Sequence, residues 1–337
     1  MPTTDASVAT APSTRHTLKG RLFHWGRILL VLAVVAAAVW TVHGHWVEVR
    51  DTVEHMSWTD WLPAFLALPV AIGLSTLSWQ LLVDELGEPA GFSRGAQIFL
   101  VGQLGKYLPG SVWAYVLQME LGRRAGLARA RVFTATLFSL AVAVVAALMC
   151  GVLAIPSLST HDESLRALRW LYVLLPVGLV CLHPRILDRL VSVAFRLLRR
   201  PPLDHPVRGR AVLLSLLAAV GSYVAFGLHL WLLARGTDGD VGVGLLPLCV
   251  GAMAAAMISG LFFFVLPSGA GVRELVLVTA LAPYVGEGPA IALAAVSRVL
   301  LTLADLLTAL GAAALGLYER RQHGPIHHDP GIDDDEV

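Results

Sequence analysis

Two cations stand beside prolines and glycines in two short stretches of an otherwise apolar chain. The first stretch is GKYLPGSVW, residues 105–113, which contains Lys106; the second is VLPSGAGVRE, residues 265–274, which contains Arg273. A charged side chain inside hydrocarbon is costly, so it is kept where it pairs with another group or lines a wet cavity. Two such cations could together hold an anion, and the anion abundant at that depth is a lipid phosphate.

The prolines and glycines of the two stretches predict broken helices. Pro109 and Pro267 lack a backbone donor and disfavour helix in the preceding residue, while the neighbouring glycines permit a turn. Backbone groups freed inside a membrane persist only where protein or water satisfies them. The helices that restart after each break would point positive dipole ends into the membrane. The candidate site residues from the two stretches are Lys106, Tyr107, Pro109, Gly110, Trp113, Pro267, Gly269, Gly271, Arg273 and Glu274.

Plainer interpretations of these residues stay open. Proline and glycine are common in membrane helices as simple kinks. From a shallow hairpin, Lys106 could extend to the headgroup region. Glu274 stands at a helix start, where capping alone would explain it.

A further ionisable pair lies in the last apolar segment. Arg298 and Asp305 are about two turns apart on one helix face, with Thr302 between them. Both are expected to face the interior of a bundle, because a charge at the bilayer centre costs at least ~2.5 kcal/mol. They either form an ion-pair network with Arg273 or Glu274, or line the path of a lipid headgroup.

The elements that must position these residues are apolar helices. The chain is 56% hydrophobic and 15% charged, against roughly 25% charged residues in a soluble domain, and its mean hydropathy is +0.69. Apolar stretches recur that are long enough to cross a ~30 Å hydrocarbon core as helices. Full spans are expected at about 27–42, 61–83, 131–155, 168–182, 211–234 and 289–317; regions 92–121 and 244–286 are apolar but interrupted.

The distribution of arginine and lysine sets the expected orientation. Seven arginines place segment 183–210 on the inside, and Arg320 with Arg321 place the C-terminus there. Glu120 is expected at the cytoplasmic mouth with Gln118. Parity then requires 92–121 and 244–286 to enter and leave on one face each, on opposite sides of the membrane.

The predicted fold is therefore all-α. It is a polytopic helical membrane bundle with six full spans and two re-entrant hairpins, broken at Pro/Gly, in inverted arrangement. Residues 1–22 are expected to form a disordered cytoplasmic leader, 23–318 the transmembrane domain, and 319–337 a disordered cytoplasmic tail. Both termini are expected on the cytoplasmic side of the cytoplasmic membrane.

No pattern for catalysis is visible. The chain has no HExxH, GxSxG or phosphate-cradling loop, so it is not expected to be an enzyme or to hold a metal or cofactor. Nucleic acid is not an expected partner, and the sequence leaves the oligomeric state open.

The motifs GQLGKYLPGSVW, LGRRAGL, LPSGAGVRE and SRVLLTLAD resemble the transmembrane region of lysylphosphatidylglycerol synthases, a flippase-like family of integral membrane proteins. The resemblance covers about residues 20–320. It implies a bundle with re-entrant helices that moves a lipid across the bilayer.

Two departures from the family pattern limit what the resemblance implies. The chain ends soon after the last span, so aminoacyl-transferase activity is not expected. Residues 133–145 lack the Glu-Arg pair of many relatives, which argues against a phosphatidylglycerol-type substrate.

The expected function is binding and translocation of an anionic phospholipid or polyprenyl-phosphate lipid. The alternatives are a membrane-embedded transferase that acts on a lipid-phosphate carrier, and a non-transporting partner subunit of a separate transferase.

Overall fold

The computed structural model describes residues 57–108, 112–154, 171–183, 208–237, 241–262 and 271–323, together with a few single positions such as Gly269. All regular structure in these ranges is helical. The longer helices are α3 (Trp58–Glu85), α5 (Val112–Arg124), α6 (Arg129–Val152), α8 (Leu171–Cys181), α10 (Gly209–Arg235), α11 (Leu246–Phe262), α12 (Val272–Val285) and α13 (Glu287–His323). The short helices are α4 (Phe92–Ala96), the π-helix η1 (Gln97–Val101), and the 3₁₀ helices η2 (Leu104–Tyr107) and η4 (Val243–Leu245).

Five of the described helical segments are long and apolar enough to cross a membrane: Trp58–Glu85, Arg129–Val152, Gly209–Arg235, Val243–Gly260 and Glu287–Glu319. Four of them agree with expected spans. The fifth lies in region 244–286, which was expected to be a hairpin. The expected span 27–42 lies outside the described residues, and α8, at the expected span 168–182, is only 11 residues long. The protein is thus an all-helical, multi-pass membrane protein.

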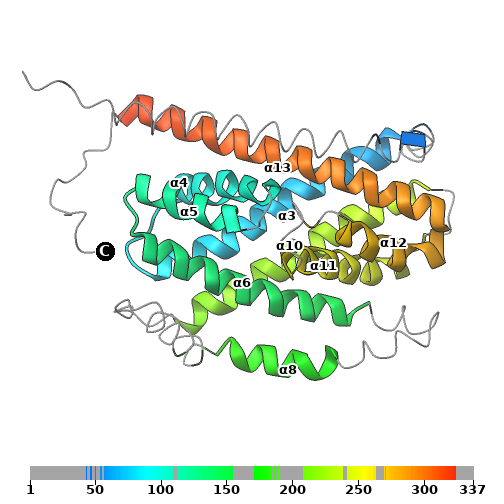
Figure 1. Cartoon of the computed structure of the whole chain (residues 1–337), viewed down its shortest axis with the longest axis horizontal. Helices are drawn as coiled ribbons and strands as arrows, with labels where there is room; N and C mark the ends of the chain where they lie inside the picture. Colours follow the sequence, from blue (N-terminus) through cyan, green and yellow to red (C-terminus); the bar gives the residue numbers. More distant parts are fainter. Residues whose placement is uncertain are drawn as a thin grey trace, which may run out of the picture.

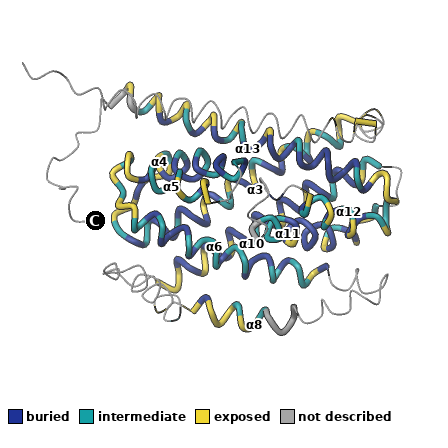
Figure 2. Tube along the Cα trace, viewed as in Figure 1, coloured by how far each residue is buried: buried dark blue, intermediate teal, exposed yellow. Residues whose placement is uncertain are grey.

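The bundle is held together at its centre by α3, α10, α6 and α11, with α13 along one side and α8 at the outside (Figure 1). Buried positions follow the inward faces of these helices (Figure 2). Large apolar side chains such as Leu66, Leu217 and Leu307 are exposed instead, as expected of a surface that faces lipid. Small residues allow close helix contacts: a Cβ on Gly227 of α10 would lie 2.4 Å from Val250 Cα of α11.

Two helix pairs occupy opposite ends of the bundle (Figure 1). The first helix pair comprises α4, η1 and η2 followed by α5; the second comprises α11 and α12. Ser93 of the first pair hydrogen-bonds Glu319 at 2.7 Å, and Lys106 pairs with Asp305. From Ser93 to Lys106, the first helix pair therefore runs antiparallel to α13.

The start of the second pair's returning helix also meets α13 near its middle. Glu274, in the first turn of α12, pairs with Arg298 of α13. Since α12 and α13 are consecutive and run antiparallel, the later residues of α12 lie toward the start of α13. The broken ends of the two pairs thus converge on the middle of α13.

Local backbone geometry shows how the first helix pair breaks. The helix passes from α to π to 3₁₀ geometry between Phe92 and Tyr107, and Leu108 is extended with φ −80° and ψ 146°. Gly105 packs so tightly on the returning helix that an added Cβ would lie 2.6 Å from the Cα of Ala114. Pro109 and Gly110 lie outside the described residues.

The second break shows the conformations that glycine permits. Gly269 and Gly271 have φ of 67° and 86°, in the left-handed region. Pro267, expected to cause this break, lies outside the described residues. At the other end of the chain, α13 continues to His323, past the expected domain boundary at 318.

Candidate functional site: a central cavity with three charged groups

A cavity of about 270 Å³ lies where the two helix pairs meet the bundle core. Residues of α3, α5, α6, α10, α11, α12 and α13 line it, together with residues of η1 and η2. The charged side chains among its described lining residues are Lys106, Arg273 and Asp305. Three of the residues singled out from the sequence therefore meet in one cavity.

Lys106 and Tyr107 both bind Asp305 through the same oxygen. Lys106 Nζ lies 2.7 Å from Asp305 Oδ2, and the Tyr107 hydroxyl donates to Oδ2 at 2.7 Å. Asp305 is 7% exposed and the Lys106 side chain 27% exposed. No described residue hydrogen-bonds the other carboxylate oxygen, Oδ1. The pair is thus an ion pair within the bundle, and the lysine does not extend to the surface.

Arg273 has no ion pair of this kind among the described residues. It is 4% exposed, and its hydrogen bond within the described residues is a long one of 3.5 Å from Nη2 to the Ser297 hydroxyl. Asp305 and Glu274 interact with it electrostatically, yet no described carboxylate forms an ion pair with it. A buried guanidinium whose other donors meet no acceptor among the described residues lines the cavity, and such a group favours an anion.

A chain of hydrogen bonds orients Arg273. His229 Nδ1 lies 2.9 Å from the Ala64 carbonyl oxygen, and Nε2 lies 3.1 Å from Ser297 Oγ. The carbonyl can only accept, so Nδ1 carries the hydrogen and Nε2 accepts from the serine hydroxyl. The Ser297 lone pairs then remain free to accept from Arg273. Nothing in the sequence pattern indicates this role for His229.

Arg298 pairs with Glu274 rather than with Asp305. The other oxygen of Glu274 accepts from the backbone N–H of Gly271 at 2.7 Å, so Glu274 caps α12 as well. Of the two alternatives for Arg298, the structure supports the ion-pair network. The capping carboxylate also occupies the positive end of α12, where an anion was expected to bind.

The other candidate residues that the structure describes are not among the residues that line the cavity. Gly269 and Gly271 shape the start of α12. Trp113 is 52% exposed and is not among the lining residues, so the structure does not support a contact between Trp113 and a ligand in the cavity.

The cavity also has a polar wall, and most of its residues were not predicted from the sequence. It includes Ser75, Gln103, Tyr115, Gln118 and Ser139. Gln118 was expected at the membrane surface but is 1% exposed, and it accepts a hydrogen bond from Thr136 at 3.1 Å. The helical spacing of Tyr115 and Gln118 on α5 could have placed both on one inward face.

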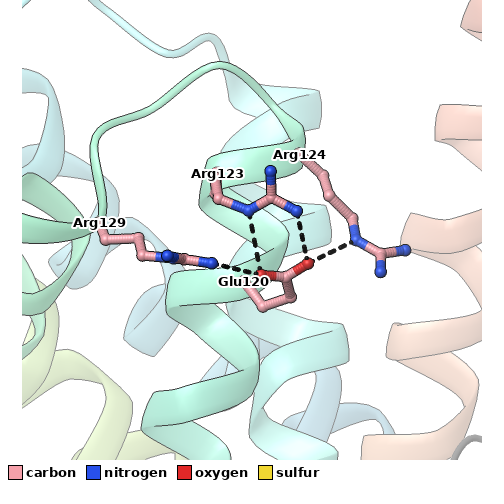
Figure 3. Close-up of polar contacts among 4 residues, drawn as sticks. All are labelled: Glu120, Arg123, Arg124 and Arg129. Atoms are coloured by element: carbon pink, nitrogen blue, oxygen red, sulfur yellow. Dashed lines mark hydrogen bonds and ion pairs between the residues drawn. The ribbon is translucent and has the colours of Figure 1, made fainter. Parts of the chain in front are cut away.

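Glu120 lies apart from the cavity, at the turn between α5 and α6. It pairs with Arg123, Arg124 and Arg129 at 2.9, 3.0 and 3.2 Å (Figure 3). Hydrogen bonds from Arg123, and then from the other two arginines, lower the pKa of Glu120 to about 2. This cluster fixes the turn and belongs to the exposed end of the first helix pair.

Comparison with known proteins adds one match. The family model described as the lysylphosphatidylglycerol synthase TM region matches residues 28–309. No curated protein matches the sequence. The match spans both helix pairs and includes Lys106, Arg273 and Asp305.

Proposed function

Since the chain belongs to the lysylphosphatidylglycerol synthase TM-region family, we propose that it binds the phosphate of an anionic lipid in the central cavity and moves that lipid across the cytoplasmic membrane. The observation that carries this proposal is Arg273, a buried cation that lines the cavity without an ion-pair partner among the described residues. Burying an uncompensated charge is strongly unfavourable, so its retention favours a role with an anionic ligand.

The charge balance of the cavity supports the same ligand class. Lys106 and Arg273 carry positive charge and Asp305 carries negative charge, which leaves an excess of one positive charge among the described lining residues. A lipid phosphate carries the opposite charge and would be attracted to it. Phospholipids and polyprenyl phosphates share this chemistry.

The cavity volume indicates which part of the lipid is bound. Pockets that enclose a drug-sized ligand measure about 300–1,000 Å³, whereas this cavity measures about 270 Å³. It would therefore take a headgroup, with the acyl or prenyl chains left in the surrounding hydrocarbon.

In the proposed topology the two helix pairs are re-entrant and enter from opposite faces, beside six full spans. The length of α11 argues for a crossing helix, but its end supports the re-entrant alternative. Gly260, near the end of α11, lines the cavity with Ile72 and Ser222, which lie near the midpoints of α3 and α10. A helix that stops at the middle of its neighbours does not complete a crossing. Inverted pairs that meet at the midplane are typical of transporters.

Lipid retention by the purified protein tests the proposal. The protein would be transferred to nanodiscs that contain phosphatidylglycerol, a polyprenyl monophosphate or phosphatidylcholine, and retained lipid counted by native mass spectrometry. We expect saturable retention of an anionic lipid and none of phosphatidylcholine; equal retention of all three would contradict the proposal.

A second assay addresses transport itself. In proteoliposomes, a labelled form of the retained lipid should cross to the other leaflet faster than in protein-free vesicles. Binding without transport would favour a partner subunit of a separate transferase. Formation of a glycosylated or otherwise modified lipid would favour a transferase.

A further inference from the structure

We infer that Asp305 is a proton-linked gate of the cavity: an anionic headgroup binds together with one proton, which Asp305 takes up on Oδ1. This inference rests on the proposed function and adds its regulation. The ligand and the Asp305 carboxylate are both anions, and both would use the charge of Lys106. Like charges that share one site disfavour each other's ionised forms, and protonation of one relieves the repulsion.

The geometry of the carboxylate makes this protonation possible without rearrangement. Lys106 Nζ and the Tyr107 hydroxyl both bind Oδ2, each at 2.7 Å. Oδ1 has no hydrogen-bond partner among the described residues, and Asp305 lines the cavity. A proton that arrives through the cavity could bind Oδ1 while Oδ2 keeps both of its donors. The carboxyl would become neutral, and the Lys106 charge would become available to the ligand.

Among the described residues around Asp305, no second carboxylate is free to take this role. The charged and titratable groups that face it are Lys106 and Tyr107 from η2, Arg273 from α12 and, two turns away on its own helix, Arg298. Glu274 is held by Arg298 and by the backbone of Gly271. Tyr115 of α5 and Tyr223 of α10 also line the cavity, and the described lining residues of α3 include hydroxyls but no ionisable group.

The charge balance then depends on the state of Asp305. With Asp305 ionised, Lys106 is neutralised and Arg273 alone faces the ligand. With Asp305 protonated, both cations face it. Binding of the anion and of the proton therefore favour each other, and by linkage one affinity must change with the concentration of the other. Net uptake of anion plus proton adds no charge to the cavity.

The first test measures proton uptake by the unaltered protein. Phosphatidylglycerol or a polyprenyl methyl phosphate would be added in weak buffer near pH 8 with a pH indicator. Both probes are phosphodiesters, so each keeps one negative charge over the range used. We expect uptake of about one proton for each lipid bound. Binding without any proton uptake would overturn the inference and leave the proposed function standing.

The second test compares variants across about pH 6 to pH 9. For the unaltered protein we expect lipid affinity to fall by up to about tenfold per pH unit on the alkaline side. Asp305→Asn keeps the shape of the side chain and the acceptor for Tyr107, and its affinity should not change with pH. Asp84→Asn is the matched control: Asp84 accepts from Gln80 at 2.8 Å, away from the cavity, and its loss should leave the pH profile intact.

The outcomes separate the two proposals. Parallel pH profiles for the unaltered protein and Asp305→Asn would overturn the proton-linked gate, while lipid binding would still support the proposed function. Failure of the unaltered protein to bind either probe at any pH would overturn the proposed function itself. Loss of folding in Asp305→Asn would leave the proton-uptake measurement to decide.

Discussion

Arg298 and Asp305 lie about two turns apart on α13, and each binds the broken end of a different helix pair: Arg298 pairs with Glu274, and Asp305 pairs with Lys106. Two helical turns correspond to a distance of about 11 Å along the axis. One helix thus holds both broken ends side by side, and the cavity lies between them. The two ion pairs have different surroundings, so their removal should have different consequences.

Loss of Arg298 should lower stability. Arg298→Met leaves the largely buried Glu274 carboxylate without its cation, which costs about 3–5 kcal/mol in comparable pairs. The double variant Arg298→Met/Glu274→Gln should recover most of the loss, because glutamine keeps an acceptor for the Gly271 N–H. The free energy of unfolding in mixed detergent micelles measures both. Rescue by Asp305→Asn in place of Glu274→Gln would contradict the observed pairing.

Close packing at the first break should make Gly105 intolerant of a side chain. A Cβ there would lie 2.6 Å from the backbone N and Cα of Ala114, so Gly105→Ala should destabilise the fold by about 1–3 kcal/mol. Gly73→Ala is the control: nothing lies within 4 Å of a Cβ at that helical position, and the change should stabilise α3 by about 0.5–1 kcal/mol. Equal effects of both changes on the unfolding midpoint would show that the break is loosely packed.

Glu120 should make the protein's stability depend on pH in the acid range. Its folded-state pKa is lowered from 4.5 to about 2, so its contribution is fully present above about pH 4.5 and is lost as the pH falls toward 2. Glu120→Gln should therefore lower the thermal midpoint at neutral pH, and the difference from the unaltered protein should shrink at about pH 3. The control is Glu88→Gln, which removes one exposed carboxylate outside this arginine cluster.

The sequence predicted the fold class, four of the described spans and the meeting of Lys106, Arg273 and Asp305. The spans were predicted from the length of the apolar stretches, and the meeting of the charges from the cost of placing a charge in a membrane. Both can be judged from the local sequence. It named Arg273 and Glu274 as possible partners of Arg298 and Asp305, but it left open which charges pair. Arg298 and Asp305 share a helix face, but partners from other helices, Glu274 and Lys106, are closer in space. Such partners depend on tertiary contacts.

The polar wall was missed for a related reason. Gln118 stands two residues before Glu120, so proximity to the charged turn suggested the membrane surface. The direction in which each side chain points decides whether it is buried: Gln118 is 1% exposed, while Glu120 faces the arginines of the turn. The role of His229 depends on Ala64 and Ser297, which lie in distant parts of the sequence.

The two ends of α10 should be accessible from opposite sides of the membrane. In a background without Cys150, Cys181 and Cys249, we expect Thr237→Cys to react with an impermeant thiol reagent added outside intact cells. Arg208→Cys should react only after permeabilisation, because the seven arginines of 183–210 favour the cytoplasmic side. The reverse pattern would contradict the orientation and the proposed cytoplasmic termini.

Binding of an anionic lipid by Arg273→Gln tests the central claim most directly. A charge-assisted contact is worth about 1.5–3 kcal/mol, so affinity for phosphatidylglycerol or a polyprenyl monophosphate should fall about 10- to 150-fold. Stability should be unchanged or raised, because the guanidinium has no ion-pair partner among the described residues. Arg94→Gln, at an exposed position of α4, removes the same charge and should leave affinity unchanged. Equal affinity of Arg273→Gln and the unaltered protein would contradict the phosphate site.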